Sequence, residues 1–226
     1  MAGWSGEEGR RVFLDRAEAG RALAERLAEV VTGPCVVAAI PRGGVVVARP
    51  IATRLSTPLT LVYAHKLSAP FAPELAFGAM DEDGEVVLDP RTVARLGLDP
   101  EEVEEVKARV AADIRRRMAR YGVPPLAHYL PGPAVVLVDD GLATGLTMRA
   151  ALAYARRHGA AAVTVAVPCA AAETAEQMRR EADRFESLIV DPDFVAVGAY
   201  YLDFAPVSDE EVLSLLAPRP ARPDGP

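Results

Sequence analysis

Two adjacent carboxylates, Asp139 and Asp140, are the side chains of this sequence best placed to do chemistry. They follow the apolar run 135–138, which predicts a strand buried on both faces, and a loop of small residues and threonines comes next. Carboxylates can accept hydrogen bonds from sugar hydroxyls, and loop N–H groups ahead of a helix can hold a phosphate. The stretch therefore predicts a pocket for a phosphorylated sugar, with an ordinary strand-to-helix turn as the alternative. The predicted phosphate loop comprises Gly141, Leu142, Ala143, Thr144, Gly145, Leu146 and Thr147.

This loop differs from the two best-known phosphate-binding loops. It lacks the lysine and the spacing of the P-loop pattern G-x-x-x-x-G-K-[ST]. It also lacks the dinucleotide pattern G-x-G-x-x-G, in which an acidic residue follows the loop by about 20 residues and does not precede it. We therefore expect neither a P-loop nucleotide site nor a Rossmann dinucleotide site.

A second turn rich in glycine lies between a predicted strand over 35–40 and a predicted helix over 45–55. Glycines let a backbone approach an anion closely, and an arginine can bond a phosphate through two N–H groups. We interpret this turn as an anion-binding loop, with a plain turn that carries a surface arginine as the alternative. The residues of this second loop are Pro41, Arg42, Gly43 and Gly44.

Lys66 is one of only two lysines in a chain whose other basic side chains are arginines. It follows a predicted strand over 59–64, and residues 65–73 contain two prolines, which predicts a mobile loop. The scarcity of lysine favours a role for Lys66 with an anion. The alternative is a lysine that extends along apolar surface and places its ammonium in water.

Together these motifs resemble those of the type I phosphoribosyltransferases. In that family an apolar strand, two acidic residues and a loop ending in Thr-Gly-x-Thr carry the ribose-phosphate site. The resemblance covers residues 35–66 and 134–204. It implies a glycosyltransferase that uses 5-phosphoribosyl-1-pyrophosphate (PRPP) with Mg²⁺ as cofactor. Such an enzyme transfers the phosphoribosyl group to a nucleobase or related small-molecule acceptor and releases pyrophosphate.

The resemblance also implies roles for the residues quoted above. The loop 141–147 would hold the 5′-phosphate, and Asp139 and Asp140 would hold the ribose hydroxyls. Arg42 and Lys66, together with Mg²⁺, would stabilise the leaving pyrophosphate. These four side chains are the predicted catalytic residues. The metal ion would be held mainly by substrate oxygens and water, with the two aspartates as candidate protein ligands.

The segment 192–204 resembles the C-terminal segment of purine phosphoribosyltransferases, where Val-Gly and Leu-Asp-aromatic sequences lie beside the base and the metal. Aromatic residues near the end of a chain are otherwise usually part of the core, which is the alternative. The predicted base-binding residues, which would form a small C-terminal hood, are Val190, Phe194, Tyr200 and Asp203.

Ala143 stands where hypoxanthine/guanine enzymes of this family carry an aspartate, which argues against those two acceptors and leaves the acceptor unassigned. Two other functions remain open. One is a regulatory protein on the same fold that senses PRPP or a nucleotide without turnover, and the other is a hydrolase that uses water as the acceptor. The presence of Arg42 and Lys66 favours catalysis, because a nucleotide sensor has no leaving pyrophosphate to stabilise.

The composition is that of a globular protein: of 226 residues, 50% are hydrophobic and 25% are charged. The net charge of −7 argues against nucleic acid as a partner. We expect no membrane partner, because no apolar run approaches the 18 or so residues of a membrane span. Two cysteines in apolar runs and an N-terminus without an apolar signal core predict a cytoplasmic protein. We also expect a homodimer.

The apolar runs lack polar alternation and alternate with helical patterns, which predicts an α/β fold with a parallel central sheet and helices on both faces. We assign residues 1–68 and 133–216 to a phosphoribosyltransferase core. Residues 69–132 would be an insertion that contains a hairpin over 76–88 and a long helix over 100–121. Residues 217–226 are predicted to be a disordered tail.

Overall fold

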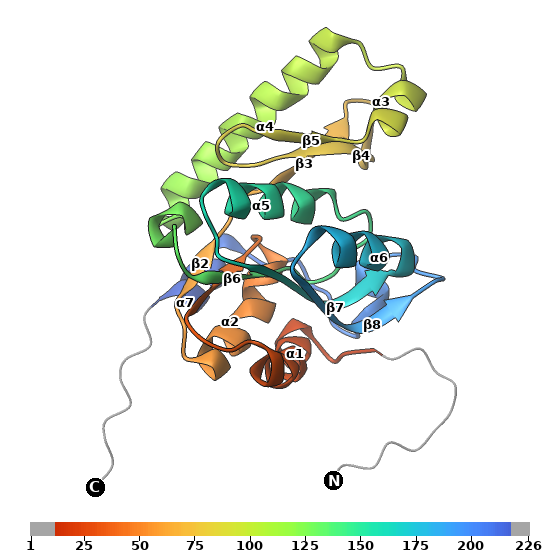
Figure 1. The fold of residues 1–226 in the computed structure, drawn as a ribbon. Helices are drawn as coiled ribbons and strands as arrows, with labels where there is room; N and C mark the ends of the chain where they lie inside the picture. The colour runs from red at the N-terminus through yellow and green to blue at the C-terminus, as the bar shows by residue number, and fades with distance from the viewer. Residues whose placement is uncertain (1–11, 218–226) are drawn as a thin grey trace, which may run out of the picture.

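A computed structural model of the chain describes residues 12–217, and a five-stranded parallel sheet forms its centre (Figure 1). The strands follow the spatial order β2-β1-β6-β7-β8, and every neighbouring pair is parallel. The predicted α/β class with a parallel central sheet is confirmed. Apart from Ala217, the predicted tail lies outside the described residues. The strands are β1 (Cys35–Ala39), β2 (Leu59–Leu61), β6 (Ala134–Val138), β7 (Val163–Ala171) and β8 (Arg184–Asp191).

Helices cover both faces of this sheet, because successive side chains of the apolar strands point to opposite sides. Val37 and Val136 pack with α1 and α2 on one face, whereas Val36 and Val135 pack with α5 and α6 on the other. Figure 1 shows α1 and α2 on one side of the sheet and α5 and α6 on the opposite side. The bounds are α1 (Arg16–Val30), α2 (Gly43–Leu55), α5 (Leu146–Arg157), α6 (Ala172–Glu181) and α7 (Asp209–Leu216).

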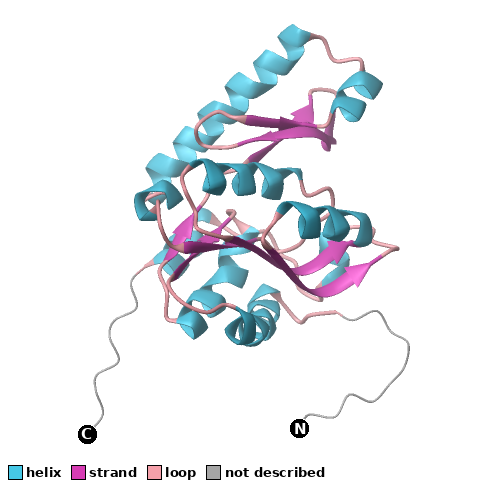
Figure 2. Ribbon diagram, viewed as in Figure 1, coloured by secondary structure: helices cyan, strands magenta, loops and turns pink. Residues whose placement is uncertain are grey.

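A second, three-stranded antiparallel sheet lies between α5 and the long helix α4 (Figure 2). It contains β3 (His65–Ala69), β4 (Ala72–Met80) and β5 (Val86–Leu88), and a short helix α3 (Pro90–Leu96) follows it. Helix α4 (Pro100–Tyr121) has the bounds that the sequence predicts. Asp99 and Glu102 form a capping box at its start, and Gly122 ends it at φ +61°.

The prediction of a mobile loop over 65–73 is wrong. His65–Ala69 forms β3, which pairs with β4 in an antiparallel register that places Lys66 opposite Ala79. Pro70 lies in the turn and Pro73 is the second residue of β4, so neither proline lies within β3. The pairing with β4 is interrupted by register shifts at Ser68, but it continues on both sides of that residue. No helix within residues 12–217 is both long and apolar enough to cross a membrane.

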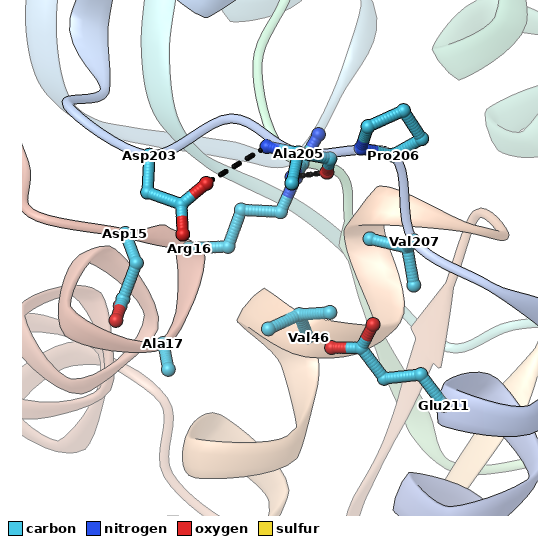
Figure 3. A pocket seen from close by; sticks show the side chains of 9 residues that line it. All are labelled: Asp15, Arg16, Ala17, Val46, Asp203, Ala205, Pro206, Val207 and Glu211. Carbon is cyan, nitrogen blue, oxygen red and sulfur yellow. Dashed lines mark hydrogen bonds between the residues drawn. The ribbon is translucent and has the colours of Figure 1, made fainter.

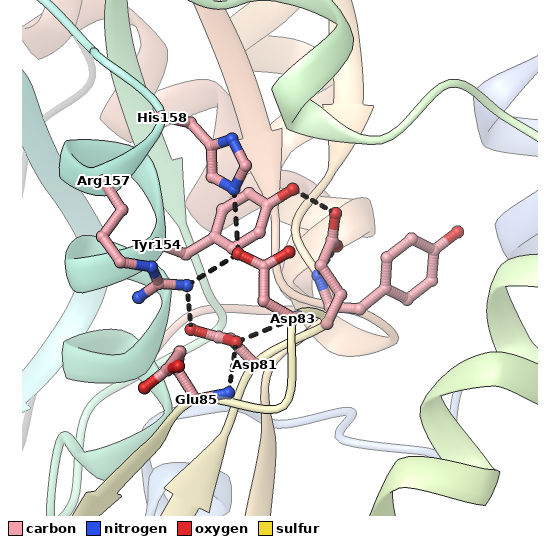
Figure 4. A network of polar contacts seen from close by, with 8 residues as sticks. Asp81, Asp83, Glu85, Tyr154, Arg157 and His158 are labelled. Carbon is pink, nitrogen blue, oxygen red and sulfur yellow. Dashed lines mark hydrogen bonds and ion pairs between the residues drawn. The ribbon is translucent and has the colours of Figure 1, made fainter.

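A polar network fastens the turn between β4 and β5 to the end of α5 (Figure 4). The Asp81 carboxylate accepts hydrogen bonds from the backbone N–H groups of Asp83 and Glu85, both at 3.1 Å. Its other oxygen lies 2.9 Å from Nη2 of Arg157, which also contacts Asp83 at 2.8 Å. His158 Nε2 lies 2.9 Å from the same Asp83 oxygen. The Asp81 side chain is 1% exposed, so Arg157 compensates a buried charge.

Substitution Arg157→Met should lower the free energy of unfolding by about 2 kcal/mol at neutral pH, because it leaves the buried Asp81 without its cation. Burial raises the pKa of Asp81, and removal of Arg157 should raise it further. A carboxyl group whose folded-state pKa is raised favours the folded state at low pH and loses that advantage as pH increases. Urea unfolding should therefore show a smaller loss at pH 5 than at pH 8.

The control is Arg156→Met on the same helix. Arg156 lies 3.7 Å from Asp183, and both side chains are about half exposed, so this change should cost less than about 1 kcal/mol. Equal losses for the two variants, or a loss in Arg157→Met that does not grow with pH, would contradict the assigned role of the network.

Candidate functional site

The two predicted loops meet at the carboxyl ends of β1 and β6, which are neighbours in the sheet. Gly43 lies against Asp140 so closely that a Cβ atom on Gly43 would stand 2.0 Å from Oδ2 of that carboxylate. A Cβ atom on Gly44 would stand 2.7 Å from the carbonyl oxygen of Val138 and 3.0 Å from Cα of Asp139. Glycine is therefore required at both positions, because any larger residue would displace the acidic pair.

The acidic pair is partly buried, and the Asp140 side chain is 17% exposed. Oδ1 of Asp139 accepts a hydrogen bond of 2.9 Å from the backbone N–H of Asp140. Burial, followed by the negative charge of Asp140, raises the pKa of Asp139 well above its usual value. Burial also raises the pKa of Asp140, and the guanidinium of Arg16 opposes that increase. The site thus places two carboxylates side by side where they are only partly exposed to solvent.

Arg16, the first residue of α1, is the cation that faces this pair, and the sequence reasoning missed it. Its Nε donates to Oδ2 of Asp140 at 2.8 Å, and its Nη1 donates to the backbone carbonyl of Ala205 at 2.9 Å. The guanidinium carbon also stands 3.7 Å from the centre of the Phe204 ring. A local signal was absent, because an arginine in the first turn of an amphipathic helix usually faces solvent.

Arg16 also lines a cavity of about 260 Å³ (Figure 3). Carboxylates of Asp15, Asp203 and Glu211 line it, together with apolar side chains. Two of these carboxylates also bond to backbone: Asp15 caps α1 through Glu18 N–H at 2.7 Å, and Asp203 accepts from Ala205 N–H at 3.0 Å. Within residues 12–217, no group of three or more His, Cys, Asp or Glu side chains is arranged to hold a metal ion.

The loop 141–147 runs from the acidic pair to the start of α5. Gly145 has a φ of +71°, and a Cβ atom there would stand 2.7 Å from Cγ2 of Thr174. Thr174 also donates a hydrogen bond to the carbonyl of Ala143 at 2.5 Å, so α6 supports the loop from behind. Ala143 and Thr144 are exposed, and the first N–H groups of α5 lie directly after them. An anion in this loop would meet backbone donors and the positive end of the helix.

Residues 190–205, called the hood below, stand beside the acidic pair. Tyr201, another residue that the sequence reasoning missed, donates its hydroxyl to the backbone carbonyl of Asp140 at 2.6 Å. Tyr200 is fully buried and donates to Asp191 at 2.5 Å, and the Phe194 ring stacks on it with a centroid distance of 4.9 Å. Val190 is 37% exposed, and Asp203 is exposed.

The structure does not join the two predicted cations, Arg42 and Lys66, to the acidic pair. Arg42 is 42% exposed, and its Nη1 lies 3.8 Å from Oδ1 of Asp209 at the start of α7. That carboxylate also accepts from the hydroxyl of Tyr121 at 2.7 Å and pairs with Nε of Arg120 at 2.9 Å, so the end of α4 meets the turn that carries Arg42. Lys66 is exposed on the edge strand β3, and within residues 12–217 its ammonium makes no ion pair.

Comparisons with known proteins agree on one family. A family model described as a phosphoribosyl transferase domain matches residues 14–205. Two Mycobacterium tuberculosis proteins, from two strains of that organism, carry the name "Putative phosphoribosyl transferase" and are each 40% identical over 206 residues. These alignments cover 91% of this chain and 46% of each relative, so the chain spans about half the length of these curated relatives.

A solved structure resembles nearly the whole chain. The crystal structure of TT1426 from Thermus thermophilus shares 45% sequence identity and superposes with a TM-score of 0.74. The match covers 91% of this chain and 97% of that chain. The fold described above is therefore shared across almost the full length of both proteins.

Substitution Gly43→Ala should destabilise the protein by about 2 kcal/mol, because the new methyl group would overlap the Asp140 carboxylate. In an Asp140→Ala background the same change should cost less than about 1 kcal/mol, since the nearest remaining neighbour is Nε of Arg16 at 3.1 Å, which has lost its bond to Asp140 and can shift by a few tenths of an ångström. Urea unfolding of the four proteins in this cycle gives the interaction energy. Equal costs in the two backgrounds would show that the loop and the carboxylate are not in contact.

Proposed function

Since the chain belongs to the phosphoribosyl transferase domain family, we propose that it transfers the 5-phosphoribosyl group of PRPP to a nucleobase or related acceptor. The transfer releases pyrophosphate. The observation that carries this proposal is the contact between the loop 41–44 and the acidic pair Asp139–Asp140 at neighbouring strand ends. That contact supports the proposal because a glycine-rich turn that could bind pyrophosphate lies beside two carboxylates that could bind ribose hydroxyls.

Each loop would have a separate task. The backbone N–H groups of 143–147 and the start of α5 would hold the 5′-phosphate. Asp139 and Asp140 would accept hydrogen bonds from the ribose hydroxyls and fix the ring for displacement at C1′. Negative charge then develops on the leaving pyrophosphate, and the turn 41–44 would stabilise it through N–H groups and Arg42. Lys66 would add a second cation from the edge of the small sheet.

Mg²⁺ suits this donor set. The two aspartates supply hard oxygen atoms, which this ion prefers, and the remaining positions would be filled by phosphate oxygens and water. When bound, the ion would neutralise part of the charge on the pyrophosphate. Asp139 and Asp140 are the residues of this chain that would hold it, directly or through water.

The acceptor would lie under the hood, where Phe194 and Val190 offer apolar surface and Asp203 offers a carboxylate. The absence of an acid at position 143 argues against hypoxanthine and guanine. Because the curated relatives are about twice as long as this chain, the acceptor could also depend on residues outside it. A homodimer remains the proposed assembly, and its mass in solution can be measured directly by sedimentation.

The test of this function is pyrophosphate release from PRPP and Mg²⁺, with one nucleobase at a time and a control without base. Release with a single base would establish the transferase and identify its acceptor. Release without any base would instead indicate a hydrolase. PRPP binding without release for any base or for water would favour the sensing protein, and absence of PRPP binding would contradict the proposal.

Substitution Asp140→Asn should reduce kcat/KM for PRPP by about 30-fold or more, which corresponds to about 2 kcal/mol of transition-state stabilisation. The amide keeps the shape of the side chain but loses the charge that accepts hydrogen bonds from the ribose. The control is Asp113→Asn on α4, where the carboxylate pairs with Arg116 at 2.8 Å on the helix surface. A folded Asp140→Asn protein with native kinetics would refute the ribose-binding role.

A further inference from the structure

Arg16 connects four segments of the chain at one point. It begins α1, and its side chain is only 10% exposed. Its guanidinium bonds Asp140 of the acidic pair through Nε and Ala205 of the hood through Nη1. A Cβ atom on Gly43 would stand 3.1 Å from Nε of Arg16, so the turn 41–44 touches the same group. Figure 3 shows the Arg16 side chain reaching to Ala205.

Arg16 binds different kinds of group at the hood and at the acidic pair. At the hood, Arg16 holds a backbone carbonyl and stacks its guanidinium on Phe204 at 3.7 Å. At the acidic pair it holds one oxygen of a carboxylate, Oδ2 of Asp140. Among residues 12–217, the hydrogen bond that the Asp140 carboxylate accepts from another residue is that of Arg16 to Oδ2, and the side chain is 17% exposed, which leaves Oδ1 for a hydroxyl group of a ligand. A ligand bonded to Oδ1 would therefore share one carboxylate with Arg16, which bonds Oδ2 and also holds the hood.

We propose that Arg16 is a positioning residue that couples occupancy of the ribose site to docking of the hood over it. The inference rests on the proposed function, because the ligand is the ribose 5-phosphate portion of PRPP. A ribose hydroxyl bonded to Oδ1 fixes the plane of the Asp140 carboxylate. The fixed carboxylate holds Arg16, and Arg16 holds Ala205 and Phe204. The acceptor site is thereby completed once the sugar is in place.

Arginine is required for this connection. Its planar guanidinium presents Nε and Nη1 in a fixed geometry, so one group can bond two partners on different segments at once. A lysine keeps the charge and can bond either partner, but its single ammonium does not hold both in that geometry. The variant Arg16→Lys therefore keeps the positive charge but loses the simultaneous bonds to Asp140 and Ala205.

A second contact joins the hood to the acidic pair, and it provides a contrast. Tyr201 donates its hydroxyl to the backbone carbonyl of Asp140. This bond does not involve the carboxylate, so it should hold the hood with or without a ligand. Tyr201→Phe should loosen the hood in both states and leave the effect of the ligand intact, whereas an Arg16 variant should abolish that effect.

The hood carries its own reporters of docking. The backbone N–H groups of Leu202 and Asp203 donate to the carbonyls of Phe13 and Leu14 at 2.8 and 2.9 Å. The Leu202 side chain is 73% exposed, which places this strand-like pairing at the surface. Amide hydrogen exchange at these two residues therefore measures how often the hood opens.

The experiment is hydrogen–deuterium exchange of the full chain with and without saturating ribose 5-phosphate, with binding first measured by calorimetry. In the native protein we expect the ligand to slow exchange at Leu202 and Asp203 by about tenfold, a typical size for coupling between two sites. In Arg16→Lys and Arg16→Met the ligand should bind more weakly. At saturation it should then leave exchange of the hood within about twofold of the ligand-free value.

The matched control is Arg26→Met, which removes an arginine from the same helix. Arg26 bonds Glu186 through Nε at 2.5 Å, far along α1 from Asp140, and its loss should preserve the tenfold effect. Native-like protection in folded Arg16→Lys at saturating ligand would overturn the inference and leave the proposed function standing. If the native protein does not bind ribose 5-phosphate or PRPP, the proposed function and this inference both fail. If Arg16→Met does not fold, Arg16→Lys decides alone.

Discussion

The placement of two adjacent carboxylates at the buried end of β6 is the constraint on which the rest of the site depends. Removing two negative charges from water is costly unless donors and cations surround them. The structure meets this need with the backbone N–H of Asp140 on Asp139 and with the guanidinium of Arg16 on Asp140. The hydroxyl of Tyr201 donates to the adjacent backbone carbonyl of Asp140, so the start of α1 and the hood both meet the acidic pair.

The two glycines of the turn 41–44 allow this turn to lie against the acidic pair. Because Gly43 and Gly44 carry no Cβ atom, the backbone of the first loop packs directly on the second. The small sheet stands further from this centre, and it is held to α5 by the Asp81–Arg157 network and to α4 by apolar packing. Through Asp209, the end of α4 also meets Arg42.

Local signals were sufficient to predict much of this fold. The apolar runs of β1 and β6, and the capping residues Asp99 and Gly122 of α4, determine their elements without help from distant residues. Both loops of the site were also predictable, because glycines and acids follow directly after strands. Strand β3 was not predictable, since its polar sequence becomes a strand only by pairing with β4. Arg16 and Asp209 were missed for the same reason: each gains its role from a partner more than one element away.

The register between β1 and β6 also has a consequence for the order of folding. It pairs Cys35 with Ala134 and Ala39 with Val138, so the two loops of the site come from segments separated by the whole of the small sheet and α4. Closing so long a loop costs conformational entropy before any contact across it is gained, and topologies dominated by such contacts fold slowly. During synthesis, the turn 41–44 emerges long before the carboxylates that it packs against. Ligand binding at this site should therefore be among the last properties that a newly made chain acquires.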